Sequence, residues 1–224
     1  MAIGTERESS LHRALKTEYA GQDGALEVSY GDFVCDAVSG EGAVIEVQTG
    51  SFKPLVKKLE WLCRERDVRV VYPVIVAKHI EVYETDGALC YRRKSPRKGS
   101  EWDVFRALIY AIELTEFPRL TINLALVDVV ERRMNDGKGA RRRKGVSIKD
   151  RILQAHCGTV VLSQKKDYLR FAPFERQDEW TARELAGKAK IHPSLARKAV
   201  YVLVKMGLVG QTGKKGRERV YKIK

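Results

Sequence analysis

The pattern of apolar and polar positions in the first half of the chain predicts a helix, a three-stranded meander, a second helix and a buried strand. Apolar residues recur at helical spacing from Thr5 to Tyr19 and again from Phe52 to Arg66. The run from Val68 to Ala77 is rich in Val and Ile and almost uncharged, which is typical of a central strand. The expected meander strands are residues 26–30, 32–38 and 43–48. This order predicts an α/β fold with a mixed sheet flanked by helices, in which the last crossover is right-handed and parallel.

The middle of the chain continues with strands and helices of less regular pattern. Asp86-Gly87 predicts the turn of a small hairpin. Further expected elements are strands at 80–83 and 88–92, a helix at 101–116, a strand at 120–130, a short helix at 150–156 and more strand between 158 and 171. Basic loops are expected at 92–98 and around Arg141, Arg142 and Arg143, where a charge run is usually a solvated face.

From Asp178 the pattern changes to two short helices and a hairpin. Pro193 fits the first turn of the second helix, and Gly207 closes that helix. The expected elements are helices at 181–189 and 194–206 and strands at 208–211 and 219–223. We therefore divide the chain into two domains, residues 1–175 and residues 178–224.

The hairpin from Phe33 to Gln48 carries the most informative pair of residues. A turn centred on Glu41 places Asp36 opposite Glu46, with Gln48 pointing the same way as Glu46. Directly opposed side chains have Cβ atoms roughly 4.5–5.5 Å apart, and like charges at that separation repel. A bound divalent cation removes this conflict and gives the pair a purpose.

The acids at these spacings resemble the motifs of the PD-(D/E)XK nuclease superfamily. The matching residues are Glu8 in the first helix, Asp36 in the second strand and Glu46-Val47-Gln48 in the third. The resemblance implies a restriction-endonuclease-like fold over about two thirds of the chain. It also implies that Mg²⁺ (or Mn²⁺) is held by Asp36, Glu46 and the Val47 carbonyl, with Glu8 as an outer member.

The chain departs from the superfamily at Gln48, where a lysine is commonest. Some members carry glutamine there, and others move the lysine to the following helix, for which Lys53 and Lys57 are candidates. In the catalytic interpretation, glutamine or lysine orients the attacking water or binds a phosphate oxygen.

Each candidate also has an ordinary structural explanation. Glu8 could be the third residue of a capping box that starts at Thr5. Asp36 could be a strand-end residue near solvent, and Glu46 with Gln48 could be the polar face of a solvated hairpin. We expect His12 and His156 to be ordinary polar residues rather than metal ligands.

The segment from Asp178 to Lys224 resembles a winged helix, the helix-turn-helix variant with a β-hairpin wing. The resemblance implies a recognition helix whose outer face bears Ser194, Arg197, Lys198 and Tyr201, and a wing tip bearing Lys214, Lys215 and Arg217. The segment holds twelve Lys and Arg against four acids, which is the electrostatic footprint of a DNA-binding face. The alternative is a winged helix that makes protein contacts.

Composition narrows the class of partner. The 224 residues carry a formal net charge of +13, with 44% hydrophobic and 32% charged residues, which favours a folded protein that binds a polyanion. No apolar run approaches the ~20 residues needed to cross a bilayer, and the four cysteines are scattered, so we expect a cytoplasmic protein without a membrane partner.

These observations predict a metal-dependent endonuclease that acts on duplex or branched DNA, with a homodimer possible. If the nuclease interpretation holds, Arg141, Arg142 and Arg143 could clamp the nucleic-acid backbone. One alternative is a DNA-binding or regulatory protein with an inactive nuclease-like domain, for which Gln48 is the best sequence support. A weaker alternative is an RNA-directed nuclease.

Overall fold

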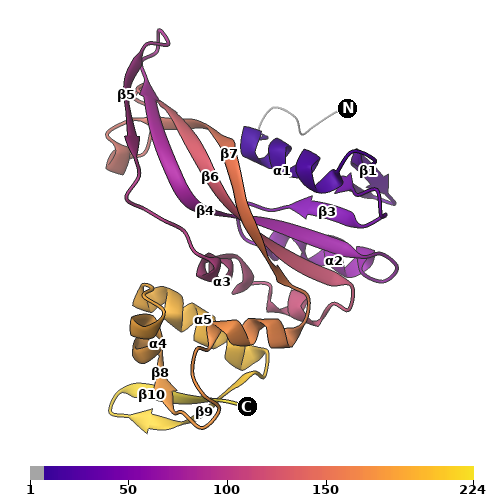
Figure 1. Ribbon diagram of the computed structural model, residues 1–224, viewed down its shortest axis with the longest axis vertical. Helices are drawn as coiled ribbons and strands as arrows, with labels where there is room; N and C mark the ends of the chain where they lie inside the picture. Colours follow the sequence, from indigo (N-terminus) through magenta and orange to yellow (C-terminus); the bar gives the residue numbers. More distant parts are fainter. Residues whose placement is uncertain (1–7) are drawn as a thin grey trace. The chain divides into compact units, whose positions relative to one another are not determined.

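The computed structural model describes residues 8–224, which form a mixed α/β protein (Figure 1). Seven strands make one sheet in the order β1-β2-β3-β4-β6-β7, with β5 paired to β4, and a three-stranded sheet follows in the order β8-β10-β9. The strands of the larger sheet are β1 (Ala25–Tyr30), β2 (Phe33–Val38), β3 (Val44–Val47), β4 (Val68–Tyr83), β5 (Leu89–Lys94), β6 (Leu120–Met134) and β7 (Ser147–Leu162).

The helices are short. Those that accompany the larger sheet are α1 (Ser10–Ala20), α2 (Val56–Leu62) and α3 (Val104–Leu108), together with the 3-10 turns η2 (Lys53–Leu55), η3 (Glu101–Asp103), η4 (Ile112–Glu116), η5 (Arg141–Arg143) and η6 (Lys165–Phe171). The C-terminal elements are β8 (Trp180–Thr181), α4 (Ala182–Lys188), α5 (Pro193–Lys205), β9 (Val209–Lys215) and β10 (Glu218–Ile223). From residue 8 onward, no helix has the length and apolar character needed to cross a membrane.

Contacts divide the chain into two compact units, each assembled from separate stretches of sequence. The first unit comprises Met1–Val47, Pro73–Ser100 and Ala125–Val160. The second unit comprises Gln48–Tyr72, Glu101–Leu124 and Val161–Lys224. Strands β4 and β6 each contribute residues to both units.

The hairpin of β2 and β3 has the predicted register. Ala37 pairs with Ile45 and Val38 pairs with Val44, so the next position along places residue 36 opposite residue 46. The turn closes through hydrogen bonds from Ser39 N to the Ala43 carbonyl (2.9 Å) and from Gly42 N to the Ser39 carbonyl (2.8 Å). Gly42 has φ +85°, a conformation that glycine adopts without the steric cost of a side chain.

Helix α1 starts later than predicted. The Ser9 hydroxyl accepts a hydrogen bond from His12 N, which makes Ser9 the N-cap. Glu8 therefore precedes the helix and cannot be a capping-box residue within its first turn, while Thr5 lies outside the described residues. Leu11 and Leu15 are buried where α1 packs on β1, β2 and β3.

Two predicted helices are wrong in form. Residues 150–156 belong to β7, because this stretch has no apolar stripe at helical spacing and pairing with β6 satisfies its backbone. The region 101–116 forms only the short pieces η3, α3 and η4 instead of one helix, although its apolar residues Trp102, Phe105 and Leu114 are buried as expected of a core-facing segment. The hairpin at Asp86-Gly87 is confirmed, with β4 and β5 antiparallel.

The C-terminal helices form as predicted, and their core uses residues from upstream. Thr181 and Glu184 cap α4 reciprocally, and Pro193 occupies the first turn of α5. Strands β9 and β10 pair antiparallel up to Lys215–Glu218, so the wing loop is tighter than predicted. Helix α5 packs on α4 and also on α3 and η3 within the same unit. The division at residues 175–178 stays a prediction.

Candidate functional site

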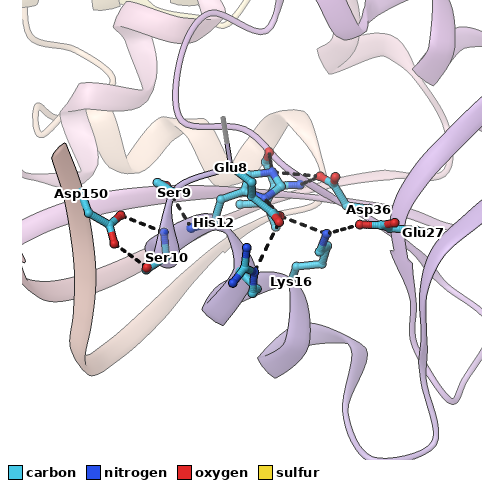
Figure 2. A network of polar contacts seen from close by, with 10 residues as sticks. Glu8, Ser9, Ser10, His12, Lys16, Glu27, Asp36 and Asp150 are labelled. Carbon is cyan, nitrogen blue, oxygen red and sulfur yellow. Dashed lines mark hydrogen bonds and ion pairs between the residues drawn. The ribbon is translucent and has the colours of Figure 1, made fainter. Parts of the chain in front are cut away.

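Two oxygen atoms predicted to bind metal lie close to one ring nitrogen in the first unit. Figure 2 shows the side chains of two of the residues involved, His12 and Asp36. The Nε2 atom of His12 is 3.0 Å from the carbonyl oxygen of Val47 and 3.3 Å from Asp36 Oδ2. The backbone N–H of Val47 donates to the same Asp36 oxygen at 2.8 Å. The Asp36 carboxylate and the Val47 carbonyl therefore face one point.

The other ring nitrogen of His12 fixes the orientation of the imidazole. Its Nδ1 atom is 2.6 Å from Glu8 Oε1. Burial alone would lower the pKa of His12, but the hydrogen bonds and negative charges of Asp36 and Glu8 outweigh burial and raise it. When the ring is protonated, both nitrogens donate, one to Glu8 and the other to the Val47 carbonyl.

Lys16 extends this network along α1. Its ammonium lies 2.9 Å from Glu8 Oε1 and 3.2 Å from Glu27 Oε1, and the residue is 4% exposed. Burial would lower the pKa of Lys16, and its two carboxylate partners raise it instead. For the acid Glu8 burial acts in the opposite direction and would raise the pKa, but the hydrogen bonds from Lys16 and His12 outweigh burial and lower the pKa. Figure 2 shows Glu8 between these two cationic side chains.

Glu46 lies on β3, and the residue is 3% exposed. The hairpin register puts it on the same sheet face as Asp36, as predicted. In the part of the chain from residue 8 onward, no group of three or more His, Cys, Asp or Glu side chains is arranged to hold a metal. The predicted inner ligand set contains only two such side chains, Asp36 and Glu46, and its third member is a backbone carbonyl, so this absence does not bear on it.

Gln48, which stands at the usual lysine position, and Lys53, one of the two candidate lysines, make local contacts in the second unit, and the other candidate, Lys57, is exposed. Gln48 Nε2 donates to the Ser51 carbonyl at 3.1 Å. The ammonium of Lys53 lies 3.2 Å from Glu113 Oε1 at an exposed position.

The DNA-binding candidates fall into two groups. Arg197, Tyr201 and Arg217 line one hollow of the second unit. The other four candidates on α5 and β9, which are outside that lining, are Ser194, Lys198, Lys214 and Lys215.

The basic loop of the first unit forms the short turn η5. Arg141 and Arg142 are exposed, whereas the Arg143 guanidinium donates to the Val146 carbonyl at 3.0 Å. Arg143 therefore helps to hold the loop closed, and the first two arginines are the ones accessible to a polyanion.

Comparison with known proteins places most of the chain in one family. Residues 9–163 match the family described as "Domain of unknown function (DUF8091)", which is more than half of the chain. The chain belongs to this family. The DUF8091 match includes His12, Asp36 and Val47 and ends before β8.

A protein of Treponema pallidum (strain Nichols), named "Uncharacterized protein", is 34% identical to this chain over 153 residues. The similarity covers 68% of this chain and 61% of the relative, so the chain spans about three fifths of that protein's length. No solved structure matches the chain.

Sequence reasoning missed two members of the site in the DUF8091 region. The sequence predicts His12 to be an ordinary polar residue rather than a metal ligand, and it does not single out Lys16, but both side chains contact Glu8. His12 and Lys16 lie four residues apart on one face of α1, and Glu8, just before the N-cap Ser9, continues the same four-residue spacing. That spacing, together with the sheet-facing stripe of Leu11 and Leu15, is the sequence pattern that indicates a shared location for Glu8, His12 and Lys16.

A second charged cluster surrounds Glu131 on β6, which is 1% exposed. The guanidinium of Arg133 donates to it at 2.8 Å and that of Arg151 at 3.1 Å, and the Lys78 ammonium lies at 3.2 Å. Burial would raise the pKa of Glu131, but these three cations lower it to about 2. The cluster therefore joins β4, β6 and β7 within the first unit.

Proposed function

We propose that this protein is a Mg²⁺- or Mn²⁺-dependent DNA endonuclease of the PD-(D/E)XK type. One observation carries the proposal: Asp36 Oδ2 and the Val47 carbonyl oxygen both lie within 3.3 Å of a single nitrogen, His12 Nε2. The point at which the two oxygens converge is the one that the superfamily resemblance assigns to a metal ion.

The donor set suits a hard cation. Carboxylate and carbonyl oxygens are the ligands that Mg²⁺ prefers, and Asp36, Glu46 and the Val47 carbonyl would hold it. A bound ion would lower the pKa of a water ligand and neutralise charge on the phosphate. The hydrogen bond from Val47 N fixes the Asp36 carboxylate beside the Val47 carbonyl.

The charge distribution supports DNA as the substrate. The net charge is +13, and the segment from residue 178 is strongly basic. Arg141 and Arg142 are exposed in the same unit as Asp36. Contacts of these arginines with phosphates would position the DNA backbone without selecting a base sequence.

Cleavage by the purified protein tests the proposal directly. We expect supercoiled plasmid or branched DNA to be nicked with Mg²⁺ or Mn²⁺ and left intact with EDTA, because the proposed chemistry requires the ion. Single-stranded RNA in the same assay separates a DNA enzyme from an RNA enzyme. If no DNA form is cut with any divalent metal, the enzymatic proposal is wrong.

The second candidate is a DNA-binding protein with an inactive nuclease-like domain. The local contacts of Gln48 with Ser51 and of Lys53 with Glu113 favour it, since the glutamine at the usual lysine position and one of the two candidate lysines are engaged in other contacts. DNA binding supported by Ca²⁺, without cleavage in Mg²⁺, would favour this candidate.

Metal affinity gives a readout that does not depend on cleavage. We expect His12→Ala to bind Mn²⁺ about tenfold more tightly than the wild type, because His12 contacts the two oxygens that the ion would use and such charged hydrogen bonds are worth about 1.5–3 kcal/mol. Titration calorimetry measures the change. His156→Ala, which removes a histidine bonded to Glu18 and Thr159, should leave the affinity unchanged. Weaker binding by His12→Ala would make His12 a ligand instead of a competitor.

A further inference from the structure

A hollow of about 660 Å³ opens in the second unit between α5 and the β9–β10 hairpin. Its lining includes Val200 and Val204 of α5 and Tyr221 of β10. Tyr201, one turn after Arg197 on α5, lines the same hollow and is 48% exposed. The hollow therefore offers apolar and aromatic surface to a ligand of small-molecule size.

The charge of the lining selects the chemistry of the ligand. Four arginines line the hollow, Arg183, Arg197, Arg217 and Arg219, against one acid, Glu218, which pairs with Arg183 at 3.0 Å. The ammonium of Lys205 lies 5.9 Å from the centre of the Tyr201 ring and adds further positive charge. An anionic ligand with a flat apolar part would complement this lining.

A paired DNA duplex does not supply that combination, because its base faces are covered by their stacked neighbours. An unpaired nucleotide does supply it: the base presents a flat ring for stacking on tyrosine or arginine, and its phosphate presents a charge. A cavity of several hundred cubic ångströms suits one or two such nucleotides.

We infer that the hollow between α5 and the β9–β10 hairpin binds unpaired nucleotides of a DNA strand, with Tyr201 as the stacking platform and the surrounding arginines on the phosphates. The inference rests on the proposed DNA binding and deepens it. The substrate class becomes DNA with a single-stranded overhang or branch.

Three labelled DNA hairpins test this inference by fluorescence anisotropy with the full chain in EDTA, so that no cleavage occurs. One hairpin is blunt, one has a four-nucleotide thymidine overhang, and one has an overhang of equal length made of abasic sites. The last two carry the same phosphates and differ only in their bases. We expect the thymidine overhang to bind at least about fivefold more tightly than the abasic one.

Variants assign the effect to the hollow. Tyr201→Ala should make the thymidine and abasic probes bind alike, and Tyr201→Phe, which keeps the ring, should preserve the difference. Lys198→Ala, on α5 but outside the lining, should weaken binding of all three probes together, because a phosphate contact is insensitive to bases.

Equal binding of the thymidine and abasic overhangs by the wild type would overturn the inference, whatever the variants do. This outcome is separate from the fate of the proposed nuclease. A protein that prefers the thymidine overhang but never cleaves DNA retains the binding site and loses the enzymatic proposal. A protein that cleaves DNA but binds the thymidine and abasic overhangs equally retains the enzymatic proposal and loses the binding site.

Discussion

Replacing Asp36 with asparagine should lower metal-dependent DNA cleavage by at least about 100-fold. The substitution removes the negative charge that would hold the cation. A bound cation contributes several kcal/mol of transition-state stabilisation, and this contribution would be lost with it. The amide oxygen of asparagine can still accept the hydrogen bond that Val47 N now donates to Asp36. The hairpin should therefore keep its structure, and the loss should be specific to the ion-dependent reaction. Initial rates of plasmid nicking with Mg²⁺ measure the effect.

Asp32→Asn is the matched control for this experiment. Asp32 lies in the turn before β2 and is exposed, so the same chemical change there should leave cleavage within about twofold of the wild type. Circular dichroism of the two variants checks that both are folded. Nicking by Asp36→Asn at the wild-type rate would show that the site is elsewhere.

Replacing Glu131 with glutamine should lower the free energy of unfolding by about 3 kcal/mol near neutral pH. The pKa of Glu131 falls from 4.5 to about 2 in the folded protein, and each pKa unit corresponds to about 1.4 kcal/mol. The substitution also leaves the partly buried cations Lys78 and Arg133 without their carboxylate. Removal of one partner from a buried charge cluster typically costs about 3–5 kcal/mol. Denaturation by guanidinium chloride measures the loss.

The pH dependence of this difference has a definite sign. Because the carboxyl has a lower pKa in the folded chain than in the unfolded chain, its stabilisation is fully present above about pH 4.5. The stabilisation is lost as the pH falls towards about 2, so the stabilities of the wild type and Glu131→Gln should converge there.

Glu113→Gln is the control, because it removes a surface partner of Lys53 and should cost less than about 1 kcal/mol of stability. If the difference in free energy of unfolding between the wild type and Glu131→Gln stays constant down to pH 2, the Glu131 carboxylate is not the source of the lost stability.

Local chemistry was enough to predict the hairpin of β2 and β3. Its turn residues, Ser39 to Gly42, fix the loop length, and a fixed loop length sets which strand positions oppose each other. The start of α5 was predicted from an equally local signal, because Pro193 suits the first turn of a helix. In these places the sequence carries its own boundary signals.

The features that were missed depend on partners distant in sequence. Residues 150–156 form a strand because of pairing with β6, and Ser10 on α1 donates to Asp150 at 2.9 Å through its backbone N–H. No pattern within residues 150–156 contains that information. The position of His12 beside Val47 likewise depends on how α1 packs on the hairpin, so periodicity could place His12 on a face but could not give its contacts.

The interleaving of the two units along the chain has a consequence for synthesis. The segment from Ala125 to Val160, which completes the first unit, leaves the ribosome long after Val47. At about 5–20 residues per second, the N-terminal hairpin of the nascent polypeptide waits on the order of 10 s for these strands. For part of that interval the edge of β4 that later pairs with β6 has no partner strand, which makes this edge a natural point of engagement for a chaperone.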